Sequence, residues 1–235
     1  MAAETQVLIN NEKKYIAKFF SDAAESDVKK VDLSTLTWAK HTITLSGVAS
    51  PNFKIGEVLT VGAEKYLVTG FTAGASTVEV VGWDNTNKKA IAIDASSSSS
   101  DAVSGGVSGV NTRTYSSIAE QDYNVLVTKI MWITNGLQVR IEWDGSDAEK
   151  HIAELAGNGS WSMPGNEWPG IPINATGDSG AVLGDIQFNT TGHGSGDSYT
   201  IIMELKKQAP GYDIPAYEQN NILGYPVDYL LGNFT

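Results

Sequence analysis

The sequence has no cysteine and only three histidines among its 235 residues. The lack of cysteine excludes disulfide bonds, thiolate zinc sites and thiol nucleophiles, so packing, subunit contacts or both must stabilise the fold. Basic residues are also scarce: 16 Lys and Arg stand against 27 Asp and Glu, a formal net charge of −11. Such a chain lacks the basic surface that releases counterions from nucleic acid or binds anionic lipids. We therefore expect no direct contact with nucleic acid or with a membrane.

Long apolar runs are missing as well. The first residues, MAAETQVLINNEKK, do not combine a basic stretch with an apolar core as a secretion signal does. No run approaches the roughly 18 apolar residues of a membrane-spanning helix. These features predict a soluble protein that is made in the cytoplasm.

Helical periodicity is absent too, and alternation of apolar and polar residues dominates. The pattern predicts strands at 14–20 and 27–36 across the turn SDAAES, followed by a meander of five short strands between residues 38 and 94. The low-complexity stretch Ala95–Val110 then predicts a linker or exposed loop. The 24 glycines agree with a β-rich, loop-rich protein.

Strong strand patterns resume at residues 124–145, where Asn135-Gly136 predicts a hairpin with a type I′ turn. Residues 184–207 predict a second long hairpin, with shorter strands between the two. The alternation assigns one set of side chains to the core: Val125, Val127, Ile130, Trp132, Val139, Ile141 and Trp143.

The predicted fold is an all-β antiparallel β-sandwich with an inserted small β-meander or barrel subdomain and an extended C-terminal arm. Residues 1–36 supply the first strands of the sandwich, 37–111 the insertion with its linker, 112–208 the main sandwich and 209–235 the arm.

The arm is rich in apolar side chains but has prolines at 210, 215 and 226, which keep it out of the central ladder of a sheet. We expect it to pack on another subunit, which implies a homo-oligomer. The alternative is that the arm wraps its own sandwich and completes the core of its own chain. The predicted contact residues in the arm are Tyr212, Tyr217, Tyr225, Tyr229, Leu230 and Phe234.

The sequence GDSG around Ser179 matches the nucleophile turn of chymotrypsin-like proteases. A serine attacks only if a histidine takes its proton and a carboxylate orients that histidine. His41 precedes Ser179 at a suitable distance, but it lies in an alternating strand, where we expect its imidazole to face solvent. Because Asp, Ser and Gly also favour turns, we predict that Ser179 is a turn residue and that the chain has no catalytic residues.

Two loops combine tryptophan with oxygen ligands, at Trp83–Asn87 and Trp143–Glu149, but neither has the spacing of a calcium loop. We interpret both as turns after a buried tryptophan and predict no metal and no cofactor. Trp161 and Trp168 flank the loop SMPGNE and offer two alternatives: a stacking platform for sugars, or a sandwich rim or subunit contact.

Three stretches carry a resemblance to a known class of protein. They are VKKVDLSTL, IMWITNGLQVRIEWDG and GDIQFNTTGHGSGDSYTIIMELKK, within residues 26–36 and 120–207. This part of the chain resembles small virion structural proteins of tailed bacteriophages. The resemblance implies a non-enzymatic protein of the virion, either a capsid decoration protein that binds the major capsid protein or a component of the neck or tail. A carbohydrate-binding adhesin and a hydrolase remain as alternatives from other classes.

Overall fold

The structure, a computed structural model, describes residues 3–45, 54–72, 75–93, 102–104, 113–120, 123–144, 150–162, 170–172, 185–208 and 211–212. The chain forms two compact units. Unit 1 contains Met1–Leu33 and Asp122–Gln208, and unit 2 contains Ser34–Gln121 and Ala209–Thr235. The described residues form antiparallel strands and one 3-10 turn, η1 (Leu33–Thr35), but no α-helix. The all-β prediction is confirmed.

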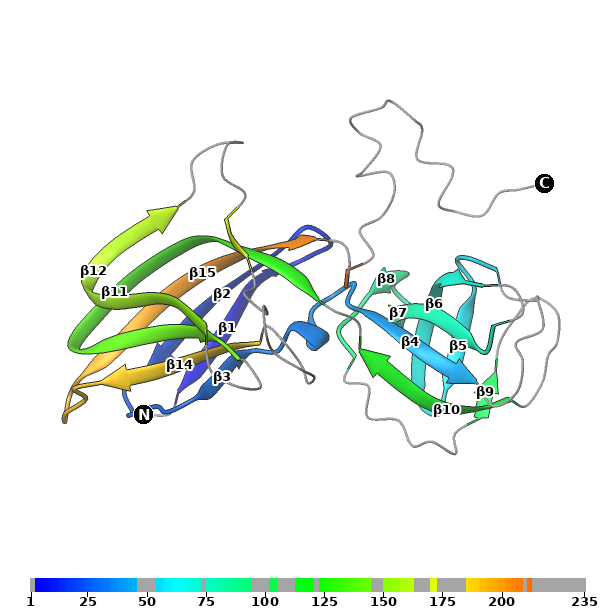
Figure 1. Cartoon of the computed structure of the whole chain (residues 1–235), viewed down its shortest axis with the longest axis horizontal. Helices are drawn as coiled ribbons and strands as arrows, with labels where there is room; N and C mark the ends of the chain where they lie inside the picture. Colours follow the sequence, from blue (N-terminus) through cyan, green and yellow to red (C-terminus); the bar gives the residue numbers. More distant parts are fainter. Residues whose placement is uncertain are drawn as a thin grey trace, which may run out of the picture. The chain divides into compact units, whose positions relative to one another are not determined.

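Unit 1 contains one eight-stranded sheet (Figure 1). Its strands are β1 (Glu4–Asn10), β2 (Lys14–Ser21), β3 (Val28–Val31), β11 (Asn124–Trp143), β12 (Lys150–Ser162), β13 (Ile171–Pro172), β14 (Ile186–Thr191) and β15 (Ser198–Gln208). The order of the main path is β1-β2-β15-β11-β14-β3, and both β12 and β13 also pair with β11.

This sheet folds over so that its two halves face each other. The rings of Phe19 in β2 and Phe188 in β14 lie 5.2 Å apart, although these strands are not neighbours in the sheet. Both rings are fully buried. The sandwich-like core therefore lies between two layers that belong to one sheet, and β11 passes from one layer to the other.

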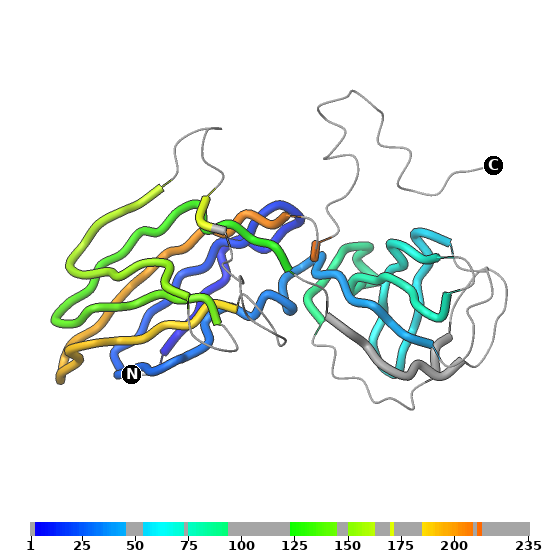
Figure 2. Tube along the Cα trace, in the orientation of Figure 1, coloured from blue at the N-terminus to red at the C-terminus, as the bar shows by residue number. Residues whose placement is uncertain are grey.

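Both predicted hairpins were wrong. The two halves of β11 do not pair with each other, and β14 and β15 pair with β11 instead of with each other. Residues 124–135 of β11 pair with β15, whereas residues 138–143 pair with β14. Figures 1 and 2 show β11 folding back at one end of the unit. Gly136 lies at this corner with φ of 77°, and a Cβ there would overlap the carboxylate of Asp197. Asn135-Gly136 thus marks a reversal of the chain. The two segments that it joins lie in different layers and do not hydrogen-bond to each other as a hairpin would.

Most of the predicted core side chains of unit 1 are buried, with one exception. Four of them, Val125, Val127, Val139 and Ile141, are fully buried. Ile130 and Trp143 are each only 1% exposed. Trp132 is only half-buried, so its assignment to the core was wrong. Its ring lies over Gly159 of β12, and its indole nitrogen donates to the carbonyl of Ala156 at 3.2 Å. The alternation placed Trp132 on the same face as Ile130 but did not show that its ring is only partly covered there.

The N-terminal strands also pair differently from the prediction. β2 and β3 do not form a hairpin, because β2 pairs with β1 and β15 while β3 pairs with β14 in the other layer. β1 was not predicted, because its side chains are mostly exposed and give no clear alternation. We expected η1 to be part of a strand, but it forms a 3-10 turn, although Leu33 and Leu36 are buried as expected.

Unit 2 is a small β-barrel. Its strands are β4 (Lys40–Leu45), β5 (Val58–Val61), β6 (Glu64–Phe71), β7 (Thr77–Asp84), β8 (Lys89–Ala90), β9 (Ala102–Ser104) and β10 (Arg113–Glu120). They follow the order β4-β10-β9-β5-β6-β7-β8, and a further pairing of β4 with β7 closes the ring. The interior is apolar and includes Ile43, Leu59, Tyr66, Val68 and Val80.

Two strands of the barrel correct the predicted boundaries. Residues 102–104 form β9 within the stretch that we expected to be a linker. Residues 113–120 form β10, which pairs with β4 and β9 and so belongs to unit 2 rather than to the main sandwich. The chain leaves unit 1 after Leu33 and returns at Asp122, whereas the sequence predicted boundaries at 37 and 111.

The start of the predicted arm packs on unit 2. Tyr212 is 1% exposed and forms a β-bridge with Ala39, and the amide of Lys40 donates to the carbonyl of Gly211 at 2.9 Å. Tyr212 is therefore a core residue of its own chain, and its assignment as a contact for a neighbour was wrong. The other predicted contact residues of the arm lie outside the described residues: Tyr217, Tyr225, Tyr229, Leu230 and Phe234.

Candidate functional site

The described residues give His41 no role as a catalytic base. Its side chain is 1% exposed, and its Nδ1 has no hydrogen-bond partner. Burial lowers the pKa of His41 to about 4, so the imidazole is neutral near pH 7. We expected this ring to face solvent. That expectation was wrong because position 41 shares its face with Ile43 and Leu45, which line the barrel core. Ser179 lies outside the described residues.

The first of the two predicted turns is a self-contained loop. Asp84 Oδ2 accepts from the side-chain amide of Asn87 at 2.6 Å, and Oδ1 accepts from the backbone amides of Asn87 and Thr86 at 3.0 and 2.9 Å. These bonds, the Asn87 side chain first, lower the pKa of Asp84. In the second, Trp143 is buried as expected, but residues 145–149 lie outside the described part. Within the described ranges, no three His, Asp or Glu side chains gather as a metal site would require. The same ranges contain no helix long and apolar enough to cross a membrane.

The proposed tryptophan platform is described only in part. Trp161 lies in β12 opposite Ile130 and is half-buried, whereas Trp168 lies outside the described residues. Ile130 points into the core of unit 1. Because residues directly opposite each other share a face, Trp161 points toward the core side at the margin of the sheet. This position agrees better with the rim alternative than with a sugar platform.

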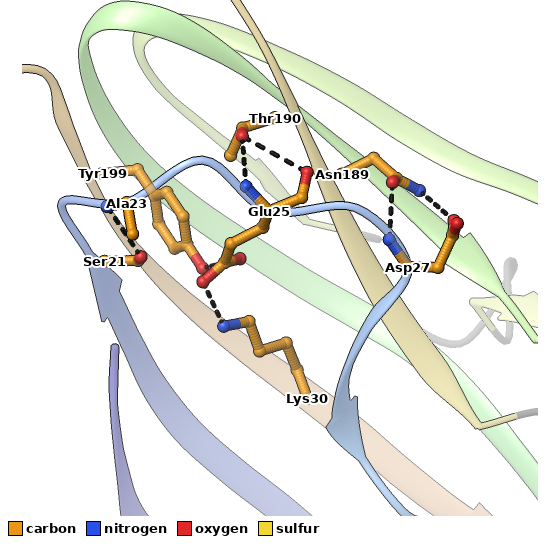
Figure 3. A network of polar contacts seen from close by, with 8 residues as sticks. All are labelled: Ser21, Ala23, Glu25, Asp27, Lys30, Asn189, Thr190 and Tyr199. Carbon is orange, nitrogen blue, oxygen red and sulfur yellow. Dashed lines mark hydrogen bonds and ion pairs between the residues drawn. The ribbon is translucent and has the colours of Figure 1, made fainter. Parts of the chain in front are cut away.

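A buried polar network joins the loop after β2 to strands β14 and β15 (Figure 3). Glu25 accepts from Lys30 Nζ at 2.6 Å and from the hydroxyl of Tyr199 at 2.7 Å. The side chains of Glu25 and Lys30 are only 4% and 5% exposed. The amide of Glu25 donates to Thr190 Oγ1 at 2.8 Å. Burial, followed by the bond to Glu25, raises the pKa of Tyr199, which therefore stays protonated.

Lys30 also lies 5.9 Å from the ring centres of Phe188 and Tyr199, close enough for cation–π attraction. Because all these groups satisfy one another away from solvent, we assign the network to stability: it fixes the loop Ser21–Val28 onto the corner formed by β14 and β15. The sequence signal that could have revealed it is the charged pair Glu25 and Lys30 beside a buried strand.

A second buried carboxylate, Asp185, fastens β3 and η1 to the start of β14. Its Oδ1 accepts from the amide of Leu33 at 2.8 Å, and its Oδ2 lies 2.5 Å from Lys29 Nζ. Asp185 is fully buried, whereas the Lys29 side chain is 47% exposed. Burial raises the pKa of Asp185 more than the bonds from Lys29 and Leu33 lower it. Burial of the Asp185 carboxylate thus costs free energy, and the carboxylate lies where β3 and β14, which are distant in the chain, meet.

Strands β2, β15 and β11 present an exposed outer surface in unit 1. Met131 of β11 lies opposite Ile202 of β15, and Ile133 lies opposite Thr200, which in turn lies opposite Phe20 of β2. Residues in register share a face, so these side chains form one patch. Met131 is 40% and Ile133 64% exposed. We call this patch the apolar face and define it by Phe20, Met131, Ile133 and Ile202.

Two hollows mark this surface. An open groove of about 690 Å³ runs along Met131–Thr134, Gly157–Ser160, Thr200 and Ile202, between β11 and β12. A smaller hollow of about 250 Å³ is lined by Glu4, Gln6, Lys18 and Phe20. The surface is therefore shaped rather than flat, and it can receive side chains from another segment.

The rim of the apolar face is basic although the chain as a whole is acidic. The register puts six charged side chains on this surface among the described positions: Lys14, Lys18, Lys129, Lys206, Glu4 and Glu204. Glu204 already accepts from the hydroxyl of Thr128 at 3.1 Å. An apolar centre with four lysines at its rim suits an acidic, apolar partner. This surface could not be predicted from the sequence, because the strands that build it are distant in the chain.

Comparisons with known proteins give no independent indication of function: no family model, no curated protein and no solved structure matches this chain. The function must therefore be argued from its own residues.

Proposed function

We propose that the chain is a non-enzymatic structural protein of a tailed-phage virion, acting as a capsid decoration protein that stabilises the shell. The observation that supports the proposal most is the contact between the segments that carry the resemblance. VKKVDL and GDI are about 150 residues apart, yet β3 pairs with β14. Asp185 of GDI holds both Lys29 and the amide of Leu33. The resembling stretches thus lie together in one structural unit, and this contact supports the proposal.

The apolar face supplies the contact surface that such a role needs. Large apolar side chains exposed together on a folded unit are typical of surfaces that bind another protein. Here they lie on three paired strands, whose backbone is held by neighbours on both sides, so the surface is preorganised. We propose further copies of this chain as the partners of the apolar face, and the major capsid protein or another virion protein as the partner of the assembled copies.

Localisation on particles tests the proposal. Purified virions of the phage that encodes the chain are digested and analysed by mass spectrometry, and antibodies against unit 2 locate it by electron microscopy. The proposal expects labelled heads, and it expects heads that lack the chain to rupture at a lower temperature than complete heads. Label confined to necks or tails would overturn the decoration role in favour of the neck or tail alternative. Absence of the chain from virions would overturn the proposed function.

A further inference from the structure

We propose that the apolar face binds residues 213–235 of a second copy of this chain. The inference rests on the proposed function in one respect: a virion structural protein associates with its own copies. The occupant is a segment of stated sequence, DIPAYEQNNILGYPVDYLLGNFT.

The segment matches the apolar centre of the surface. It contains nine large apolar or aromatic side chains of the kinds that anchor interfaces: Ile214, Tyr217, Ile222, Leu223, Tyr225, Tyr229, Leu230, Leu231 and Phe234. Its 23 residues also agree with the roughly 20–30 residues that each partner contributes to a standard interface.

The segment also matches the rim in charge. It contains Asp213, Glu218 and Asp228 and no lysine or arginine. The surface offers Lys14, Lys18, Lys129 and Lys206 around the apolar centre. The acidic side chains of the segment attract the lysines of the rim. They are repelled by the rest of the surface, because the chain as a whole is acidic, so the segment favours this face.

The prolines of the segment fit a face better than an edge. Pro215 and Pro226 cannot donate backbone hydrogen bonds, so a segment with both is a poor added strand. The apolar face needs no backbone hydrogen bonds from its partner, because β2, β15 and β11 each already pair with a neighbouring strand on both sides. Side chains alone make the contact.

The starting point of the segment is fixed. Tyr212 is buried on unit 2 beside Ala39. From there, 23 residues reach at most about 80 Å when extended. That length exceeds the roughly 40 Å that the 12 residues 124–135 of β11 span at about 3.3 Å per residue, so the segment is long enough to lie along the whole face.

The experiment uses the full chain with a photo-crosslinking phenylalanine derivative in place of Tyr225. Light- and heavy-nitrogen chains are mixed, co-refolded, irradiated and digested with trypsin. We expect crosslinks from position 225 to the peptide 130–140, which carries Met131 and Ile133, in products that combine both labels. Crosslinks to this peptide within one label only would show that the chain binds its own segment and would overturn the inference. Crosslinks elsewhere, or none, would overturn it as well.

A matched pair of variants ties the contact to the face. Ile133 and Ile55 are 64% and 65% exposed, but Ile55 lies on unit 2. We expect Ile133→Glu to lower the mixed-label crosslink yield about tenfold, as for loss of an interface anchor, and Ile55→Glu to leave it unchanged. Equal yields for both variants contradict the inference. If Ile133→Glu changes the melting curve, the charge reversal Lys18→Glu/Lys129→Glu replaces it, with a lower yield again expected. These outcomes do not depend on finding the chain in virions, so the inference and the proposed function fail separately.

Discussion

Replacement of Lys30 by methionine should destabilise unit 1 more than any other single loss of positive charge. The Lys30 ammonium contacts Glu25 at 2.6 Å, and both side chains are at least 95% buried. Without Lys30, the Glu25 carboxylate stays buried, and the hydroxyl of Tyr199 still donates to it at 2.7 Å. Removing one partner of a buried ion pair costs about 3–5 kcal/mol, because the other charge is left uncompensated. Since Tyr199 still donates to Glu25, we expect a loss near 3 kcal/mol.

A partly exposed pair provides the control. Lys40 Nζ lies 3.0 Å from Glu79, whose side chain is 45% exposed. Water can solvate that carboxylate when the lysine is removed, so Lys40→Met should cost less than about 1 kcal/mol. The double replacement Glu25→Gln/Lys30→Met removes both buried charges and should cost less than Lys30→Met alone.

Urea unfolding measures these differences, and hydrogen exchange of peptides from β14 and β15 assigns the loss to unit 1. The midpoint should fall for Lys30→Met at an unchanged denaturant slope. A loss below about 1 kcal/mol for Lys30→Met would refute the reasoning. The reasoning would also be refuted if the double variant Glu25→Gln/Lys30→Met lost as much free energy of unfolding as Glu25→Gln and Lys30→Met lose together when measured singly. The two charges would then act independently.

Three further predictions concern single side chains of unit 1. Asp185→Ala leaves the amide of Leu33 without its acceptor and should cost about 1–3 kcal/mol, whereas Asp185→Asn keeps an acceptor and should cost less in thermal unfolding; equal losses would contradict this. Burial lowers the pKa of Lys207 from 10.5 to about 7, so the unfolded chain binds the extra proton between these values. The stability of the wild type relative to Lys207→Met should therefore rise from pH 7 to pH 10, and a flat difference in urea midpoints would contradict it. Trp143→Ala should cost about 3–5 kcal/mol and Trp132→Ala clearly less by the same measurement, because only Trp143 is fully buried; the reverse order would contradict the fold.

The sequence was sufficient to place most strands but not to pair them. Alternation located β2 to within a residue, because β2 buries every second side chain, and it predicted a five-strand meander where β4–β8 lie. It did not reveal that β11 serves two layers, since Asn135-Gly136 favours a chain reversal whether or not the flanking strands pair with each other. Pairing depends on which layers finally meet, and that information is spread over the whole chain.

The candidate surface illustrates the same limit. Met131 and Ile133 alternate with Ile130, Trp132 and Thr134, which lie on the opposite face of β11, so the sequence shows Met131 and Ile133 as outward positions only. Their neighbours Ile202 and Phe20 come from strands about 70 and 110 residues away, brought into register by the pairing of β11, β15 and β2. By contrast, the error at His41 was avoidable: strict parity with Ile43 and Leu45 already predicts an inward ring.

Incorporation of two variants into particles tests most directly whether the apolar face is the assembly surface of a virion protein. Chains with Ile133→Glu or Ile55→Glu are supplied in place of the wild type, and quantitative mass spectrometry counts each in purified virions. The two isoleucines are almost equally exposed, so the substitutions differ mainly in location. We predict that Ile55→Glu reaches the wild-type copy number and that Ile133→Glu falls about tenfold below it. Equal incorporation of the two variants, or absence of the wild-type chain from virions, would contradict the account.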